Sequence, residues 1–206
     1  MKMRLIEYTP NPEDVCGKAA AVCTRSSNYQ KALQHSIASG HESVLEHASF
    51  TFKIEGISRV CLAQLTRHRL MSFSVESQRY AKAQDSYRIP DNMEDNPDVH
   101  KTMIACDELY YTLLGQGIPA EDARYILPQA VTTDLILTAN ARELRHFFEL
   151  RCCNRAQDEI RELADKMLEL CMEVAPVIFG DAGPRCVNGK GCRELKPCGR
   201  PRGNEE

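Results

Sequence analysis

The sequence has no hydrophobic run that approaches the length of a membrane span. A spanning helix needs ~20 consecutive apolar residues, and the longest apolar runs here are far shorter. The N-terminus also lacks the apolar segment and the small-residue cleavage site of a secretory signal peptide. We therefore expect a cytoplasmic protein without a membrane partner.

The chain also lacks a large net charge and internal repeats. A formal net charge of −3 argues against a general nucleic-acid-binding protein. The composition, 43% hydrophobic and 27% charged, is ordinary for a globular protein, and 206 residues favour one domain with a sizeable core. We place this domain at residues 1–184.

Residues 185–206 have no aromatic side chain and cannot form a core of their own. They contain three cysteines, four glycines, two prolines and six basic residues. Cys186, Cys192 and Cys198 do not have a zinc-binding spacing and supply only three ligands, so a mobile tail is favoured over a zinc knuckle.

Ten cysteines without a secretory signal indicate a reducing compartment and free thiols rather than disulfides. Cys61, Cys106 and Cys171 lie in apolar stretches and are expected to be buried. Cys152 and Cys153 are adjacent and cannot readily bond to each other.

Hydrophobic periodicity and capping residues predict a mixed α/β fold in a single domain. Strands are expected at residues 3–8, 49–54 and 131–138. Helices are expected at residues 12–22, 29–38, 59–65, 97–115, 120–127, 140–148 and 160–174, and a surface loop at 85–98. If the helix after Ser58 continues, Gln64, Arg67 and His68 share one of its faces.

The most informative stretch is residues 67–80, where basic side chains and hydroxyls crowd together. Guanidinium groups match the oxygen pairs of phosphate and carboxylate, and neighbouring hydroxyls complete the same shell. A solvated basic face is the alternative. Leu70, Met71, Phe73 and Val75 are interleaved without helical or strand periodicity, which favours a pocket for a small anion.

This stretch resembles the defining motif of the flavin-dependent thymidylate synthases, R-H-R-x-x-S-x-x-x-x-S-x-R-Y. All seven specified positions are met, by Arg67, His68, Arg69, Ser72, Ser77, Arg79 and Tyr80.

Further family patterns extend the resemblance over roughly residues 41–160. The stretch from His41 to His47 is similar to the family's H-E-[ST]-x-x-E-H, in which the position of Ser43 touches the flavin nucleotide. Ala123 to Pro128 is similar to A-R-x-x-L-P, in which the arginine contacts the nucleotide substrate. The helix from Asn140 and the pattern beginning at Arg151 also resemble family segments.

The resemblance implies a central, mainly antiparallel sheet flanked by helices, in a homotetramer whose flavin and substrate sites lie between subunits. It implies reductive methylation of dUMP to dTMP, with FAD as cofactor, methylenetetrahydrofolate as carbon donor and NADPH as reductant. Arg151 matches an arginine that favours ionisation of the pyrimidine N3, which makes it the expected catalytic residue.

The positions carried over form two sets. Those expected to bind dUMP are Gln64, Arg67, Val75, Glu76, Ser77, Gln78, Arg79, Arg124 and Arg151. Those expected to bind FAD are Ser43, Arg67, His68, Arg69, Val75, Asn140, Arg142 and His146. His41 is either at the flavin or satisfied by a capping hydrogen bond.

Other functions fit the sequence less well. A flavin-free thymidylate synthase needs a cysteine nucleophile in a Pro-Cys-His setting, whereas Pro-Cys occurs here only at Pro197 and Cys198, in the tail. An RNA-binding module would use Phe73 and Tyr80 as stacking platforms, but the net charge disfavours it. His41 and His47 have no third ligand at metal-binding spacing, so no metal is expected. Ser77 has no base placed beside it by the sequence, so anchoring is favoured over nucleophilic attack.

Overall fold

The computed structural model describes residues 1–80, 86–188 and 191–199. Its backbone contacts divide the chain into two compact units. Unit 1 comprises residues 1–2, 54–67 and 73–136, and unit 2 comprises residues 3–53, 68–72 and 137–206. Where the sequence predicts one domain, each of the four strands of the described residues has residues in both units, so neither unit is an independent stretch of sequence.

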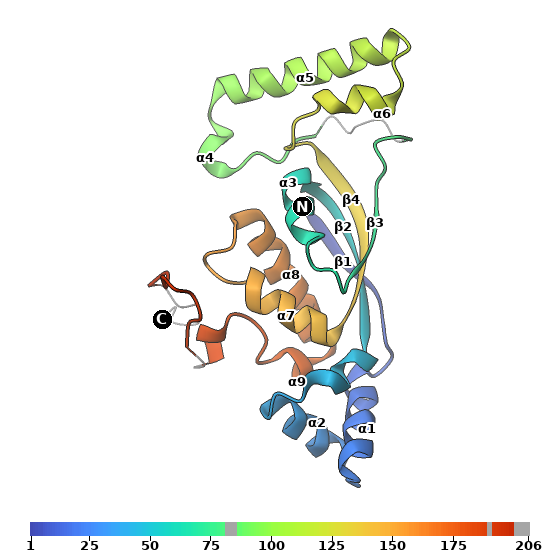
Figure 1. Ribbon diagram of the computed structural model, residues 1–206, viewed down its shortest axis with the longest axis vertical. Helices are drawn as coiled ribbons and strands as arrows, with labels where there is room; N and C mark the ends of the chain where they lie inside the picture. Colours follow the sequence, from blue (N-terminus) through green and yellow to red (C-terminus); the bar gives the residue numbers. More distant parts are fainter. Residues whose placement is uncertain (81–85, 189–190, 200–206) are drawn as a thin grey trace. The chain divides into compact units, whose positions relative to one another are not determined.

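The strands of the described residues are β1 (Lys2–Tyr8), β2 (Ser49–Ser58), β3 (Ser72–Val75) and β4 (Thr132–Asn140) (Figure 1). Unit 2 contains the order β1-β2-β4, and unit 1 contains the order β2-β4-β3. In unit 1 the amide of Gly56 donates to Asp134 Oδ1, and that of Arg59 donates to the carbonyl of Val131. Residue numbers rise along β2 as they fall along β4, so these two strands pair in the antiparallel direction, as predicted.

Strand β2 buries alternate side chains, as its sequence pattern predicts. Phe50 and Phe52 are buried in unit 2, and Ile54 is buried in unit 1. The strand leads into helix α3 (Arg59–Leu65), whose first turn is capped by Ser58 Oγ, 3.0 Å from the amide of Cys61.

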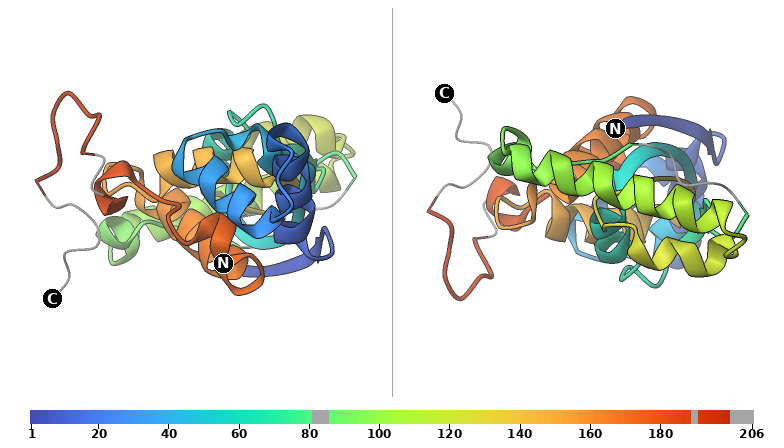
Figure 2. Two further views of the ribbon diagram at one scale, coloured as in Figure 1. Left: turned by 90° about the horizontal axis from the view of Figure 1, so that it is seen from below. Right: turned by 90° about the horizontal axis from the view of Figure 1, so that it is seen from above.

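Unit 2 contains most of the helices. Near the N-terminus, α1 (Pro12–Thr24) and α2 (Tyr29–Ala38) lie side by side (Figures 1 and 2) and are followed by the 3₁₀ helix η1 (Glu42–His47). A Cβ at Gly17 would lie 2.8 Å from the carbonyl oxygen of Tyr29, so the close approach of α1 to α2 requires glycine there.

Helices α7 (Ala141–Arg151) and α8 (Asp158–Val174) complete the core of unit 2, with the short α9 (Pro176–Phe179) after them. Asn140 caps α7 by accepting from the amide of Glu143 at 2.9 Å. As predicted, α7 buries Leu144, Phe147 and Phe148. The face of α8 that was predicted to be apolar is also buried, at Ile160, Leu163, Met167 and Cys171.

Unit 1 carries α4 (Asp91–Glu94), α5 (Pro97–Gly115), α6 (Ala120–Ala123) and the 3₁₀ helix η2 (Arg124–Ile126). Asn96 and Pro97 start α5 as predicted. Its apolar stripe buries Tyr110 fully, whereas Cys106 is only half-buried, contrary to expectation, because the face of α5 beside it is partly open.

Two local predictions are wrong. Helix α3 ends at Leu65, so Gln64, Arg67 and His68 do not share a helical face. Ser72–Val75 forms β3 although the sequence shows no strand period there. The reason is tertiary pairing: just after β3, the amide of Glu76 donates to the carbonyl of Asp134 at 2.9 Å.

Three smaller differences concern segments with weak local signals. The predicted loop at 85–98 contains α4, although Asp85 itself lies outside the described residues. Helix α9 was not predicted. The predicted helix at 120–127 is α6 continued by η2.

All ten cysteines are free thiols. Cys61 and Cys171 are buried as predicted, and burial raises the pKa of Cys171 and raises the pKa of Cys16 to about 11. No helix of the described residues is both long and apolar enough to cross a membrane.

Arg145 ties three segments of unit 2 together although its side chain is only 8% exposed. Its Nε donates to Glu42 Oε1 of η1 at 2.9 Å, and its Nη1 donates to Asp181 and to the carbonyl of Ile178. The carboxylates outweigh burial and raise the pKa of Arg145, so the guanidinium stays charged. This contact fixes η1 against α7.

We therefore expect Arg145→Met to lower the free energy of unfolding by about 2 to 4 kcal/mol, because two carboxylates would lose their buried partner. Lys166→Met is the matched control. Lys166 pairs with Glu162 at a half-exposed position of α8, so its loss should cost less than about 1 kcal/mol. Urea denaturation measures both variants, and equal costs would contradict the structural role of Arg145.

Candidate active site

Most of the residues expected at the flavin belong to unit 2, which contains α7. Arg142 of α7 donates to Glu46 of η1, which brings the element of Ser43 beside the N-terminus of the helix. Both partners are about half exposed, at 52% and 47% of their side chains. Ser43 and His41 are exposed as well, and His41 makes no side-chain capping bond to η1, which removes the capping alternative.

His68 is the buried member of this group. Arg151 Nε donates to His68 Nε2 at 3.1 Å, and Glu143 Oε1 lies 3.5 Å from His68 Nδ1. The ring packs edge-on against Phe147, with centroids 4.9 Å apart, and lies 6.2 Å from the ring of His146.

The electrostatics of this cluster keep the imidazole neutral. Burial, then Arg151 and His146, lower the pKa of His68 to about 4. Burial raises the pKa of Glu143, an effect that His146 opposes. Nε2 accepts from Arg151 and Nδ1 faces the carboxylate of Glu143, and these two contacts together place the single ring proton on Nδ1 at neutral pH.

The residues expected at dUMP include a cationic group in unit 1. Arg79 Nε donates to Glu121 Oε2 of α6 at 2.8 Å, and Arg124 Nε donates to the carbonyl of Glu121 at 3.0 Å. The ring of Tyr80 lies 5.5 Å from the Arg79 guanidinium carbon. The hydroxyl of Ser77 accepts from the amide of Arg79, which is an anchoring contact of the loop after β3.

Arg59 and Glu143 were missed by the sequence reasoning. Arg59 Nη2 donates to the carbonyl of Glu76 at 3.1 Å, next to the predicted substrate loop. Burial and nearby Arg124 lower the pKa of Arg59, and Glu76 opposes them. Arg59 stands outside every motif and gave no signal. Glu143 gave one, because it is an acidic residue four positions before Phe147 on the buried face of α7.

The predicted residues divide between the units by their expected ligand. All those expected at dUMP except Arg151 belong to unit 1. They are Gln64, Arg67, Val75, Glu76, Ser77, Gln78, Arg79 and Arg124. All those expected at FAD except Arg67 and Val75 belong to unit 2. They are Ser43, His68, Arg69, Asn140, Arg142 and His146, with His41.

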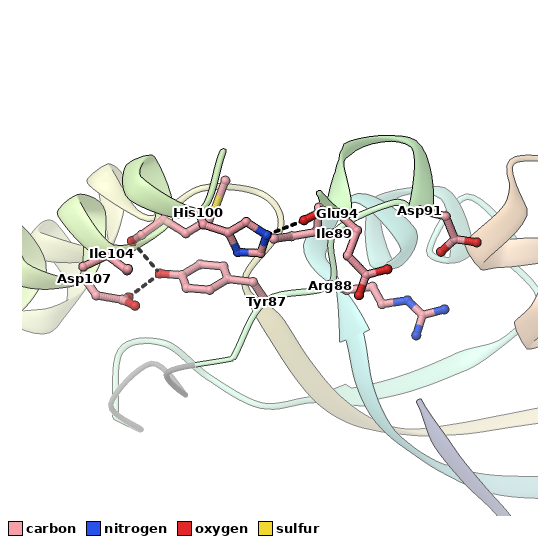
Figure 3. A pocket seen from close by; sticks show the side chains of 9 residues that line it. Tyr87, Arg88, Ile89, Asp91, Glu94, His100, Ile104 and Asp107 are labelled. Carbon is pink, nitrogen blue, oxygen red and sulfur yellow. Dashed lines mark hydrogen bonds between the residues drawn. The ribbon is translucent and has the colours of Figure 1, made fainter. Parts of the chain in front are cut away.

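One pocket, of about 550 Å³, lies in unit 1. Figure 3 shows its lining, where the hydroxyl of Tyr87 bonds to Asp107 and to the carbonyl of Met103. None of its lining residues is a predicted site residue. A second pocket of about 160 Å³, in unit 2, includes His146 and Arg145. The described residues contain no group of three His, Cys, Asp or Glu placed to hold a metal ion.

Comparison with known proteins identifies relatives of this chain. The family model described as "Thymidylate synthase complementing protein" (Thy1) matches residues 4–177. The flavin-dependent thymidylate synthase of Geobacter sulfurreducens is 46% identical over 97% of this chain and 94% of its own length. That of Pyrococcus furiosus is 40% identical over 97% and 93%.

Solved structures show the same fold. The flavin-dependent thymidylate synthase ThyX of Helicobacter pylori, complexed with FAD and dUMP, is 28% identical and covers 89% of this chain and 100% of its own, with a TM-score of 0.75. The UMP/dUMP methylase PolB of Streptomyces cacaoi, 24% identical, has a TM-score of 0.78 over 87% and 93% of the two chains. The chain therefore belongs to the flavin-dependent thymidylate synthase family.

The lowered pKa of His68 predicts a pH dependence of stability. The unfolded histidine takes up a proton below its ordinary pKa of 6.5, whereas the folded one resists protonation down to about pH 4. The contribution of His68 to the free energy of unfolding is therefore complete above pH 6.5 and is lost as the pH falls to 4. For a pKa shift of this size the loss is about 3 kcal/mol.

His68→Gln should remove this dependence, because glutamine does not titrate. Glu143, whose pKa is raised, changes stability in the opposite direction, so the difference between wild type and His68→Gln isolates the histidine. Urea denaturation from pH 7 to 4 on flavin-depleted protein measures it, with exposed His35→Gln as control. Parallel curves for wild type and His68→Gln would refute the assignment.

Proposed function

We propose that this chain catalyses the reductive methylation of dUMP to dTMP, with FAD as cofactor, methylenetetrahydrofolate as carbon donor and NADPH as reductant. The observation that carries the proposal is the meeting of η1, segment 68–72 and α7 in one unit, since these three separate segments hold most of the expected flavin residues. We further propose a homotetramer with its sites between subunits, as the family resemblance implies.

The donor set of unit 2 fits a flavin nucleotide. The N-terminus of the 11-residue α7 favours negative charge, and the exposed Arg142 lies in its first turn. Arg142 is paired with Glu46, but a half-exposed ion pair is worth less than about 1 kcal/mol, so a pyrophosphate can replace the carboxylate at little cost. Exposed Arg69 and Ser43 offer further donors.

The cationic group of unit 1 suits the phosphate of dUMP. Arg79 and Arg124 both bond to Glu121 of α6, Arg79 to its carboxylate and Arg124 to its main-chain carbonyl. Forked guanidinium donors match phosphate oxygens in pairs. Ser77 offers a hydroxyl to the same phosphate, because its Oγ accepts from the amide of Arg79 and so lies beside that residue.

The flavin, when bound, supplies hydride to the pyrimidine, and the chain positions and polarises the substrate. Arg151 provides a permanent cation that stabilises an ionised pyrimidine N3. Its bond to His68 holds the guanidinium without neutralising it, since the imidazole is uncharged at neutral pH.

The purified protein should be yellow, or become so with FAD, and should release tritium from 5-tritiated dUMP only when NADPH and methylenetetrahydrofolate are present. Absorbance spectra and tritium release measure the two properties. Protein that stays colourless after incubation with FAD would overturn the proposal.

Arg151→Lys should keep the flavin and lose dUMP affinity and tritium release by roughly 10- to 100-fold, because lysine keeps the charge but loses the planar fork. Arg69→Ala is the contrasting variant, and it should weaken flavin retention instead. Flavin spectra and dUMP titration compare the two. Normal dUMP binding and release in Arg151→Lys would remove Arg151 from the substrate site.

A further inference from the structure

We propose that Glu143 is a positioning residue for Arg151, acting through the imidazole of His68. The contacts among these three groups stand independently, and only the function of Arg151 toward dUMP rests on the proposed function above. Glu143 is 7% exposed and His68 is 6% exposed, so neither is placed to contact substrate through its side chain.

The spacing on α7 explains why an intermediary is needed. Glu143, Phe147 and Arg151 lie at i, i+4 and i+8, on one face of the helix. Eight residues of helix span about 12 Å, so Glu143 and Arg151 are too far apart for direct contact. His68, from a distant segment, lies edge-on over Phe147 and reaches Glu143 with Nδ1 and Arg151 with Nε2.

The chemistry of a neutral imidazole couples the two ends. A neutral ring has one N–H donor and one acceptor nitrogen, so fixing the proton on one nitrogen fixes the function of the other. Glu143 Oε1 lies 3.5 Å from Nδ1, and a carboxylate there favours the tautomer with its proton on Nδ1. Nε2 is then an acceptor for Arg151 Nε, whereas the other tautomer would set two N–H groups against each other.

The consequence is a fixed guanidinium plane. The Nε–H bond holds the guanidinium at the base of its fork, so a histidine acceptor there helps to orient the terminal amino groups without adding negative charge. A carboxylate in direct contact with Arg151 would instead neutralise the cation that the pyrimidine requires. His68 stands between the carboxylate of Glu143 and the guanidinium of Arg151.

A test of this proposal has to account for every group that faces His68. They are Glu143, Arg151 and His146, all from α7, and the ring of Phe147. Glu143→Leu removes the acceptor at similar size. Glu143→Gln keeps an amide oxygen at the same place and is the conservative variant.

The first test reads the tautomer and needs no substrate. In ¹⁵N-histidine-labelled protein with FAD at pH 7, the His68 signals, assigned by their absence in His68→Gln, should show a protonated Nδ1 and an unprotonated Nε2. Glu143→Leu should show both tautomers, and Glu143→Gln should resemble wild type. An Nε2-protonated ring in the wild type, or an unchanged tautomer in Glu143→Leu, would overturn the proposal.

The second test separates positioning from mere stability. Glu143→Leu should lower dUMP affinity and tritium release about tenfold, the factor for a lost hydrogen bond to a charged group, and Glu143→Gln should restore them. In the Arg151→Lys background, Glu143→Leu should cause little further loss, because the group it positions is already altered. Independent, multiplying losses would refute it. A wild type without tritium release but with the expected tautomer would refute the proposed function and leave the positioning contact standing.

Discussion

Helix α7 has to bury two charged side chains among its apolar ones, and this constraint organises unit 2. An unpaired charge in the interior costs several kcal/mol, so both need partners from elsewhere in the chain. Arg145 pairs with Glu42 and Asp181, and Glu143 contacts the imidazole of His68. These pairings fix η1 and segment 68–72 against α7, and the same two segments carry Ser43 and Arg69. Ser43 and Arg69 are thus positioned by the contacts of Glu42 and His68, their neighbours in sequence.

The three leading residues of the family motif show how one short stretch meets two demands. Arg67 and Arg69 are exposed, whereas His68 between them is buried. The stretch follows the end of α3 and is not helical, so successive side chains point in different directions. The histidine anchors the stretch through α7, which leaves its neighbours exposed for ligands. A basic residue at the middle position would place a third charge in a site that lowers the pKa even of histidine.

Much of the fold was predictable because its signals are local. The caps at Ser58 and Asn96, the alternation of β2 and the apolar face of α8 each depend on residues within one element. Strand β3 was missed because its reason lies in β4, about 60 residues away. The shared helical face of Gln64, Arg67 and His68 failed for a related reason, since periodicity does not say where a short helix ends.

The candidate site likewise contains residues that local patterns predict and contacts that they do not. Motif spacing predicts Arg79, Arg124 and Arg142, because the resemblance is carried by residue types at fixed positions. It could not find Arg59 or the connection from Glu143 to Arg151, which exist only once distant segments meet. Those contacts are tertiary, and no local pattern encodes them.

Charged side chains of the described residues differ in burial, and this difference separates those that stabilise the fold from those that a ligand can reach. Arg145 and Glu143 are buried, where loss of a partner is costly. Arg142 with Glu46 and Arg79 with Glu121 are half exposed, where water and salt weaken the attraction. An incoming phosphate therefore competes with a carboxylate that contributes little to stability. Each unit holds such a replaceable pair at the residues that the sequence assigned to an anionic ligand, so the chain can exchange its own carboxylates for phosphate without disturbing the core that places them.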